Sequence, residues 1–174
     1  MTTLVEIVSE IGINWDGNFE LLAEMINKSS KAGCDAIKLQ AFQRVTCNNH
    51  PETERLLKSS VTADNIKKID ELARTNNIEW FCTPMYTEAV VFLEPYLKRI
   101  KIREIDAREL VEGKTTELIG QILETKKPII ASSEKIPIKS KINNIQWLYC
   151  IPKYPCNYDE IDFEKMKFFD GYSN

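Results

Sequence analysis

Lysine, acidic and hydroxyl side chains recur near the ends of short apolar runs in this sequence. Lys38 and Gln40 are two residues apart, so both side chains point to the same side of an extended strand. An inward lysine in an apolar interior is costly unless an acidic group or an anionic ligand meets it. Other polar residues lie at the ends of neighbouring runs: Glu10, Thr83, Lys101, Glu104, Asp106, Ser132 and Ser133. Such a set predicts a site for an anionic small molecule.

Two interpretations of these residues stay open. In the first, they form salt bridges that hold strand ends in register, for example between Glu10 and Lys38. In the second, ammonium and hydroxyl groups bind phosphate or carboxylate oxygens, and these groups are Lys38, Lys101, Ser132 and Ser133. Glu10 and Asp106 would then bind hydroxyls or transfer protons. Asn14 suits either a turn or a ligand contact.

The elements that must position these groups are predicted to alternate between β-strands and α-helices, because short apolar runs alternate with amphipathic stretches. Strands are expected at residues 4–11, 36–42, 79–83, 99–104, 128–132 and 146–151, and residues 171–174 resemble the start of a seventh. Helices are expected over residues 18–31, 62–77, 87–96, 115–126 and 159–169. Asn18 is the expected N-cap of the first helix and Gly33 its C-terminal stop. The segment around His50 and Pro51 is expected to be irregular, and residues 133–145 are too broken by Pro137 for a helix.

Repeated parallel βα units form either an open doubly wound sheet or a closed eight-stranded barrel. Gly12 and Gly17 are five apart and fit neither the dinucleotide fingerprint nor the P-loop, which disfavours the open nucleotide-binding sheet. A full barrel takes about 250 residues. The 174 residues therefore predict a single α/β domain over residues 1–174, an incomplete parallel (β/α) TIM-type barrel of six to seven units.

Charge and cysteine content narrow the expected partners. The net charge is −3 with no long run of either sign, so neither nucleic acid nor a membrane surface is an expected partner. The start of the chain is not basic and no long apolar run occurs, which predicts a cytoplasmic protein. Five cysteines without a C-x-x-C pair and the single His50 predict no Cys/His metal site. Open barrel edges predict a homo-oligomer.

Seven motifs, in order, resemble the sialic acid synthase (N-acetylneuraminate synthase) family. In the first half, EIGINWDG at 10–17 is similar to E-I-G-x-N-H-x-G, KAGCDAIKLQ at 31–40 to A-G-A-D-A-V-K-x-Q, and FCTP at 81–84 to S-T-P. In the second half, the matches are to K-I-x-S-x-E at 101–106, K-P-I-I-L-S-T at 127–133, L-H-C-T-x-x-Y-P at 148–155 and G-Y-S-D-H from 171. Their order and spacing across nearly the whole chain make the resemblance specific.

The resemblance implies a transferase that condenses phosphoenolpyruvate with an N-acetylated sugar aldehyde of the N-acetylmannosamine type. The products would be a nonulosonic acid and phosphate, made for surface carbohydrate biosynthesis with the help of manganese or magnesium. It implies catalytic roles for Glu10, Lys38, Gln40 and Asp106. It also implies substrate binding by Asn14, Lys101, Ser132, Ser133, Tyr154 and Ser173, of which Lys101, Ser132 and Ser173 would face phosphate.

The chain departs from the family pattern at several of these places. Trp15 and Tyr149 replace histidines, Pro152 replaces an asparagine, and Asp106 replaces a glutamate. Glu104 replaces a phosphate-binding serine, and its carboxylate would repel phosphate unless it were protonated or paired.

The expected metal ligands are missing as well. Asn174 stands for the aspartate that precedes a metal-binding histidine, and both expected metal histidines, the last strands and a C-terminal antifreeze-like domain fall outside the 174 residues. Little or no synthase activity is therefore expected of this chain. Two alternatives are a catalytically impaired relative that binds a ligand or another subunit, and an aldolase that forms an imine on Lys38 or Lys101.

Overall fold

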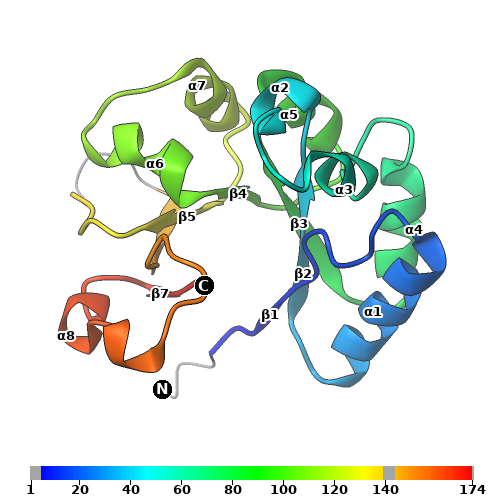
Figure 1. The fold of residues 1–174 in the computed structure, drawn as a ribbon, viewed down its shortest axis with the longest axis horizontal. Helices are drawn as coiled ribbons and strands as arrows, with labels where there is room; N and C mark the ends of the chain where they lie inside the picture. Colours follow the sequence, from blue (N-terminus) through cyan, green and yellow to red (C-terminus); the bar gives the residue numbers. More distant parts are fainter. Residues whose placement is uncertain (1–4, 139–143, 174) are drawn as a thin grey trace. The chain divides into compact units, whose positions relative to one another are not determined.

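The computed structural model describes residues 5–138 and 144–173 and separates into two compact units, Met1–Leu97 and Lys98–Asn174. Figure 1 shows that each unit consists of strands connected by helices. The strands within each unit are parallel and follow one another in chain order.

The first unit contains three strands among its described residues. They are β1 (Val8–Glu10), β2 (Ala36–Ala41) and β3 (Glu79–Pro84). The helices are α1 (Phe19–Lys31), α2 (Arg44–Cys47), α3 (Thr53–Lys58), α4 (Ile66–Thr75) and α5 (Thr87–Leu93). The register aligns Glu10 with Lys38 and Gln40 with Thr83, so the predicted polar residues lie at the carboxyl ends of neighbouring strands.

Helix α1 begins and ends as predicted. The side chain of Asn18 accepts hydrogen bonds from the backbone of Glu20 and Leu21 at 2.9 and 3.2 Å, which satisfies two of the free amides of the first turn. Gly33 follows the last turn at φ +84°, a left-handed conformation that suits glycine. Leu22 and Ile26, four apart, are fully buried and place one face of the helix in the core.

The segment between β2 and α4 is more regular than expected. The residues around His50 and Pro51 are irregular, as predicted, but the short helices α2 and α3, which were not predicted, lie on either side of them. The reason is a local apolar cluster in which Cys47 of α2 and Leu56 of α3 are buried with Phe42 and Met85. Burial of these side chains stabilises helices too short to form alone.

Four strands lie among the residues of the second unit that the structure describes. The strands are β4 (Ile100–Ile102), β5 (Ile129–Ser133), β6 (Ile145–Tyr149) and β7 (Gly171–Tyr172). The helices are α6 (Glu104–Val111), α7 (Glu117–Glu124), the 3₁₀ turn η1 (Tyr158–Glu160) and α8 (Phe163–Met166). The seventh strand expected from residue 171 is confirmed.

Strand β4 is shorter than predicted, and this changes the setting of two candidate residues. The expected strand over 99–104 ends at Ile102, and Glu104 begins helix α6. Ala107, Leu110 and Val111 recur at helical spacing and are buried, which favours a helix here. Asp106 therefore lies in the first turn of a helix and not in a loop after a strand.

The helix predicted over 159–169 is also divided. Residues 158–160 form the turn η1, and α8 starts only at Phe163. The carboxylate of Asp162 accepts a hydrogen bond from the backbone of Lys165 at 2.9 Å, which caps α8 and separates it from η1.

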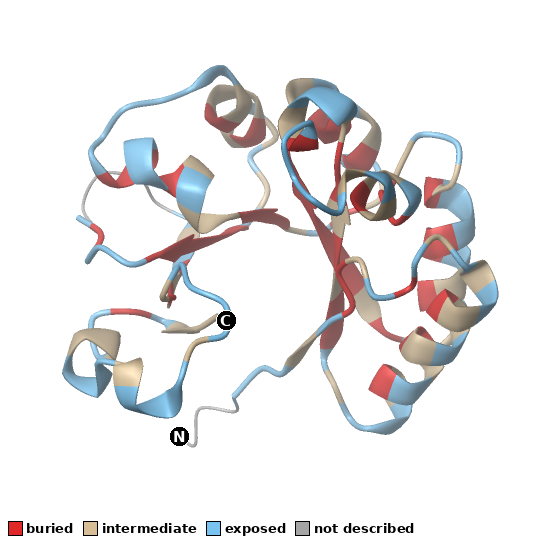
Figure 2. Ribbon diagram, viewed as in Figure 1, coloured by how far each residue is buried: buried red, intermediate tan, exposed pale blue. Residues whose placement is uncertain are grey.

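Most residues of β2, β3, β4 and β5 are buried, as the red strands in Figure 2 show. All five residues of β5 are buried, which is typical of parallel strands covered by helices. The fold class is an incomplete parallel (β/α) barrel, as predicted, whereas the single-domain boundary at 1–174 stays a prediction. None of the helices that the structure describes combines the length and the apolar character needed to cross a bilayer.

Candidate functional site

Glu10 and Lys38 form an ion pair between β1 and β2. The Oε2 atom of Glu10 contacts the Nζ atom of Lys38, its register partner on the adjacent strand. The lysine side chain is 15% exposed and the glutamate side chain 40% exposed, so the pair lies at the edge of the buried region. This is the salt bridge expected under the first interpretation. The carboxylate keeps one accessible side from which it could contact a ligand hydroxyl.

Gly12 brings two of the predicted catalytic side chains close to the backbone. A Cβ atom on Gly12 would lie 2.9 Å from Oε1 of Glu10 and 3.5 Å from Oε1 of Gln40. The amide of Gly12 donates to the carbonyl of Lys38 at 3.0 Å, which anchors the turn to β2. Thr83, the register partner of Gln40, is buried, and its hydroxyl has no hydrogen-bond partner among the described residues. The first unit therefore gathers carboxylate, ammonium, amide and hydroxyl groups.

Asn14 and Trp15 lie in the turn that follows Gly12. Asn14 is exposed, and its backbone amide donates to the carbonyl of Ile11 at 2.9 Å. Trp15 is fully buried, with its ring edge-to-face against Phe19 at a centroid distance of 5.2 Å. At the position of the family's histidine, this chain places a packed indole.

Lys101 and Ser132 form a buried pair between β4 and β5. Both residues are nearly inaccessible, at 3% and 4% exposed. The ammonium donates to the hydroxyl oxygen of Ser132 at 2.6 Å and to the carbonyl of Ile102 at 2.6 Å. An ammonium and a hydroxyl held together inside the protein are suited to bind the oxygens of an anion, because charge-assisted hydrogen bonds are strong where water is excluded.

Cys150 completes what we call the Lys101 cluster, namely Lys101, Ser132, Cys150 and Glu104. Burial, together with the nearby Glu104 carboxylate, raises the pKa of the Cys150 thiol to about 11. The ammonium of Lys101 and a hydrogen bond with Ser132 act in the opposite direction on this pKa. The thiol is therefore neutral near pH 7, and the four side chains interact electrostatically within the second unit.

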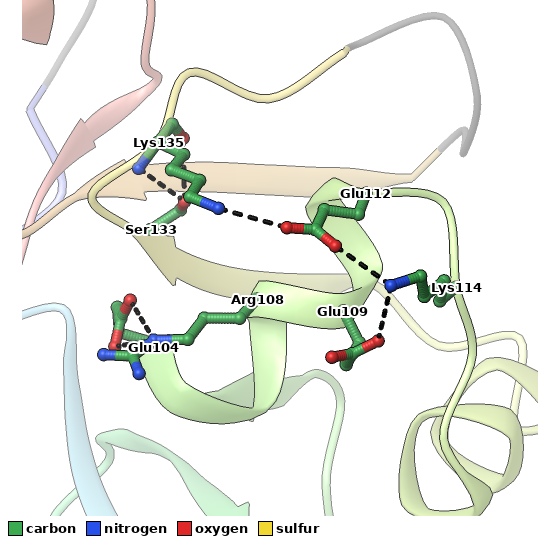
Figure 3. Close-up of polar contacts among 7 residues, drawn as sticks. All are labelled: Glu104, Arg108, Glu109, Glu112, Lys114, Ser133 and Lys135. Atoms are coloured by element: carbon green, nitrogen blue, oxygen red, sulfur yellow. Dashed lines mark hydrogen bonds and ion pairs between the residues drawn. The ribbon is translucent and has the colours of Figure 1, made fainter.

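Glu104 is held by an arginine one turn further along α6, as Figure 3 shows. Nε of Arg108 donates to both carboxylate oxygens of Glu104, at 2.8 and 3.1 Å. The Glu104 side chain is 15% exposed, whereas Arg108 is half exposed. Pairing lowers the cost of this nearly buried carboxylate. The sequence analysis did not identify Arg108. Its i, i+4 spacing to Glu104 indicates an ion pair only if residues 104–111 form a helix.

Two other candidates make local contacts in the second unit. Asp106 forms an ion pair with Nε of Arg103, and Nη2 of Arg103 donates to its Oδ1 at 3.3 Å. The hydroxyl of Ser133 donates to the carbonyl of Lys135 at 2.7 Å and accepts from its amide at 3.0 Å. Lys135 in turn pairs with Glu112 at 3.1 Å, which connects this turn to α6 (Figure 3).

The last two candidates lie near β6 and β7. Tyr154 is 79% exposed. The amide of Ser173 donates to the carbonyl of Tyr149 at 2.8 Å, which extends the pairing of β7 with β6. The Tyr149 ring is buried next to Phe169 and Tyr172, at centroid distances of 5.4 and 6.2 Å. A buried phenol thus occupies the place of the family's second histidine.

The residues that the structure describes do not fit a divalent metal ion. Over 5–138 and 144–173, no group of three or more His, Cys, Asp or Glu side chains is arranged to hold one. Nδ1 of His50 accepts from the amide of Glu52 at 3.1 Å, a contact within its own turn. Asn174 lies outside the described residues. The manganese or magnesium implied by the resemblance has no ligand set in this part of the protein.

The predicted site residues thus form two sets, each within one unit. Glu10, Lys38 and Gln40 meet in the first unit, and Lys101 and Ser132 meet in the second. Sequence reasoning missed the contributions of Cys150, which lies in the matched motif at 148–155 but was given no role, and of Arg108, which lies outside the matched motifs. Cys150 could have been found from its place directly after β6.

Known proteins share this fold and sequence pattern. An uncharacterized protein from Methanocaldococcus jannaschii is 23% identical over 92% of this chain and 50% of its own length. An N,N'-diacetyllegionaminic acid synthase from Legionella pneumophila is 23% identical over 92% of the chain and 52% of its own length. The chain spans about half the length of these curated relatives.

A solved structure and a family model agree with these relatives. An N-acetylneuraminic acid synthetase from Leptospira borgpetersenii, in complex with citrate, superposes with a TM-score of 0.78 at 22% identity, over 91% of this chain and 58% of that one. The model of the NeuB family matches residues 25–171, which is most of the sequence. The chain belongs to the NeuB family.

Proposed function

We propose that this chain is the substrate-binding part of a NeuB-type synthase that acts on phosphoenolpyruvate and an N-acetylated amino sugar. The reaction forms a carbon–carbon bond and consumes one water as phosphate leaves, giving a nonulosonic acid for surface carbohydrates. Family membership supports the proposal, as do the names of the relatives, which include N,N'-diacetyllegionaminic acid synthases.

The observation that carries the proposal is the buried hydrogen bond between Lys101 and Ser132. A buried ammonium is expensive to desolvate, and its cost is recovered where anionic oxygens bind it. The 2.6 Å contact places a hydroxyl beside the cation, and both groups are able to donate hydrogen bonds to the oxygens of an anion. An acidic three-carbon substrate matches this chemistry. The related synthetase from Leptospira borgpetersenii, solved with the carboxylic acid citrate, is consistent with it.

The first unit supplies the groups suited to a polyhydroxylated sugar. Lys38 fixes the carboxylate of Glu10, which is 40% exposed and can accept hydrogen bonds from ligand hydroxyls. Gln40, which Gly12 brings to the same place, offers an amide that both donates and accepts. We assign the amino sugar to these groups and the acidic substrate to the Lys101 cluster.

Calorimetry and a phosphate-release assay test the proposal on the intact chain. We expect phosphoenolpyruvate to bind, and N-acetylmannosamine to bind at a separate set of residues. Failure of phosphoenolpyruvate to bind would contradict the proposal. Phosphate release that requires phosphoenolpyruvate, N-acetylmannosamine and manganese together would establish the full reaction in this chain.

A second candidate is a relative that binds these ligands without turnover. It is favoured by the burial of Trp15 and Tyr149, which fill the places of two family histidines with packed rings. Binding of phosphoenolpyruvate without phosphate release would support it. Borohydride trapping of a carbonyl substrate on Lys38 or Lys101 would instead indicate an imine-forming aldolase.

A further inference from the structure

The turn between β1 and α1, residues 12–17, has an unusual backbone. Asp16 has φ +50°, a left-handed conformation that residues other than glycine rarely adopt, and Gly12 and Gly17 have φ values of +51° and +72°. A strained residue of this kind persists only where the surrounding structure holds it, and such residues are concentrated at functional sites. The contacts that hold this turn are therefore of interest.

One end of the 12–17 turn touches the groups that we assign to the amino sugar. A Cβ atom on Gly12 would lie 2.9 Å from Oε1 of Glu10 and 3.5 Å from Oε1 of Gln40. The amide of Gly12 donates to the carbonyl of Lys38 at 3.0 Å. The space open to the Glu10 and Gln40 side chains therefore depends on where the turn lies.

Ile13, the next residue of the turn, is held by the segment that contains α2 and α3. The side chain of Ile13 packs against the apolar cluster formed by these two helices. The hydroxyl of Ser59, the residue directly after α3, donates to the carbonyl of Ile13 at 3.1 Å. Ser59 is fully buried, so water does not compete for this hydrogen bond.

Asp16 and Gly17 are held by α3 itself. Nε of Arg55 contacts Oδ1 of Asp16 at 2.5 Å, and Nη1 of Arg55 contacts Glu52 at 2.9 Å. A Cβ atom on Gly17 would lie 2.7 Å from the carbonyl oxygen of Lys58, so the backbones of the turn and of α3 approach closely. The Arg55 side chain is 39% exposed and the Asp16 side chain 55% exposed, which leaves this ion pair open to screening by salt.

We propose that Arg55 and Ser59 are positioning residues for amino-sugar binding: they hold the 12–17 turn and, through Gly12, the two side chains assigned to the sugar. The inference rests on the proposed function and deepens it, because it names the support of the sugar-binding groups. The apparent affinity for a ligand falls with the fraction of molecules that adopt the binding conformation. Loss of either contact lets the strained turn relax and lowers that fraction.

Calorimetry with N-acetylmannosamine on the intact chain tests the inference. For Arg55→Met and Ser59→Ala we expect the affinity to fall about fivefold each. Affinity for phosphoenolpyruvate, which we assign to the second unit, should stay within about twofold. Asp16→Asn keeps a residue type that tolerates a left-handed backbone and should weaken sugar binding as much as Arg55→Met does. The double variant should be no weaker than either single one, because both remove the same contact.

The salt dependence separates positioning from a general loss of stability. N-acetylmannosamine is uncharged, so salt does not screen the ligand itself. In about 1 M sodium chloride, where the screening length is about 3 Å, wild type and Arg55→Met should differ less than about twofold in affinity. The Glu10–Lys38 ion pair is present in both proteins, so the difference between them reports the Arg55 contact.

Two matched controls change the same segment away from the turn. Arg44→Met removes the same charge from α2, where Arg44 is 60% exposed and pairs with Glu54 of α3 at 2.9 Å. Thr53→Val removes a hydroxyl that donates to the carbonyl of His50 at 2.7 Å. Both controls should leave N-acetylmannosamine affinity within about twofold. Thermal unfolding checks that each variant is folded, and if Ser59→Ala is not, Asp16→Asn and the salt comparison still decide.

The outcomes separate the inference from the proposed function. If wild type binds N-acetylmannosamine but Arg55→Met and Asp16→Asn weaken it no more than Arg44→Met does, the inference fails and the proposed function stands. An equal loss of phosphoenolpyruvate affinity in Arg55→Met would also overturn the inference, because the effect would then be general. If wild type binds neither N-acetylmannosamine nor phosphoenolpyruvate, the proposed function fails and the inference fails with it.

Discussion

Each unit of the protein carries an inward strand lysine, and the two lysines have different surroundings. Lys38 in the first unit is 15% exposed and contacts the carboxylate of Glu10. Lys101 in the second unit is 3% exposed and donates to the hydroxyl of Ser132 and to a backbone carbonyl. An ion pair fixes the position of a carboxylate, whereas a buried ammonium beside a hydroxyl is suited to bind an anion. Similar residues at similar places on parallel strands can therefore serve different purposes.

The largest expected effect is the loss of anion binding on changing Lys101. Lys101→Met removes the buried charge and keeps an apolar side chain of similar length, so binding of phosphoenolpyruvate should fall about 100-fold or more. Lys38→Met should weaken it less than tenfold, because Glu10 already pairs with that ammonium. Calorimetry on both variants measures the difference.

Lys135→Met serves as a control for the loss of a positive charge in the second unit. Its side chain is largely exposed and pairs with Glu112 at 3.1 Å, and solvent screening makes such a surface pair weak. Equal losses in all three lysine variants would mean that the total charge, and not the Lys101 cluster, determines binding.

The second effect concerns the close approach at Gly12. Gly12→Ala combines a left-handed backbone, φ +51°, with a Cβ that would lie 2.9 Å from the Glu10 carboxylate. We expect the free energy of unfolding to fall by about 2–3 kcal/mol, of which about 1 kcal/mol is backbone strain. Chemical denaturation measures the change.

Gly33→Ala separates the two contributions. Gly33 has φ +84°, but nothing lies within 4 Å of a Cβ at that position, so only the backbone cost of about 1 kcal/mol applies. Equal destabilisation by the two variants would show that the Glu10 side chain moves away at no cost.

The third effect is the contribution of the Glu10–Lys38 ion pair to stability. Glu10→Gln leaves a mostly buried ammonium without this carboxylate, and we expect the free energy of unfolding to fall by about 1 kcal/mol after allowance for the exposed side of Glu10. Glu24→Gln breaks the surface pair with Lys28, at 2.7 Å, and should lower the free energy of unfolding by clearly less than Glu10→Gln does, because solvent screens the exposed pair. If Glu24→Gln costs as much, the pair in the first unit is no more than a surface contact.

The sequence alone predicts the order of strands and helices and which side chains share one face of a strand. The alternation of apolar and polar residues in β2 placed Lys38 and Gln40 on one face, and the position of Glu10 at the end of the preceding strand suggested its contact with Lys38, which the register confirms. The segment around Glu104 was harder, because Ile100 and Ile102 favour a strand and nothing local marks its end. The burial of Ala107 and Leu110 stabilises a helix there, and that burial depends on tertiary contacts.

The partners of the candidate residues could be predicted only in part. Arg108 contacts Glu104 because a helix brings residues four apart together, so the error in the strand boundary also hid the ion pair. The burial of Trp15 follows from the folding of the turn onto α1 and is not encoded in the motif itself. Local pattern therefore predicts which face a side chain takes, and packing decides what it meets there.

The smallest expected effect is on the thiol of the Lys101 cluster. Burial raises the pKa of Cys150 from its ordinary value of 9.0 to about 11, so at pH 8 its thiolate fraction should be about 100-fold below that of an unhindered cysteine. Alkylation followed by mass spectrometry between about pH 7 and 9 reports this fraction for each cysteine. The rate at Cys150 should rise about tenfold per pH unit over that range.

The variants of the cluster should move this pKa in opposite directions. Lys101→Met removes a cation that stabilises the thiolate and should raise the Cys150 pKa, whereas Glu104→Gln removes an anion and should lower it. Each change should be smaller than about one unit. Cys34 in the first unit serves as the internal reference, with an unchanged alkylation rate in both variants. Shifts of the same sign would mean that altered burial, and not the charges of Lys101 and Glu104, controls the thiol.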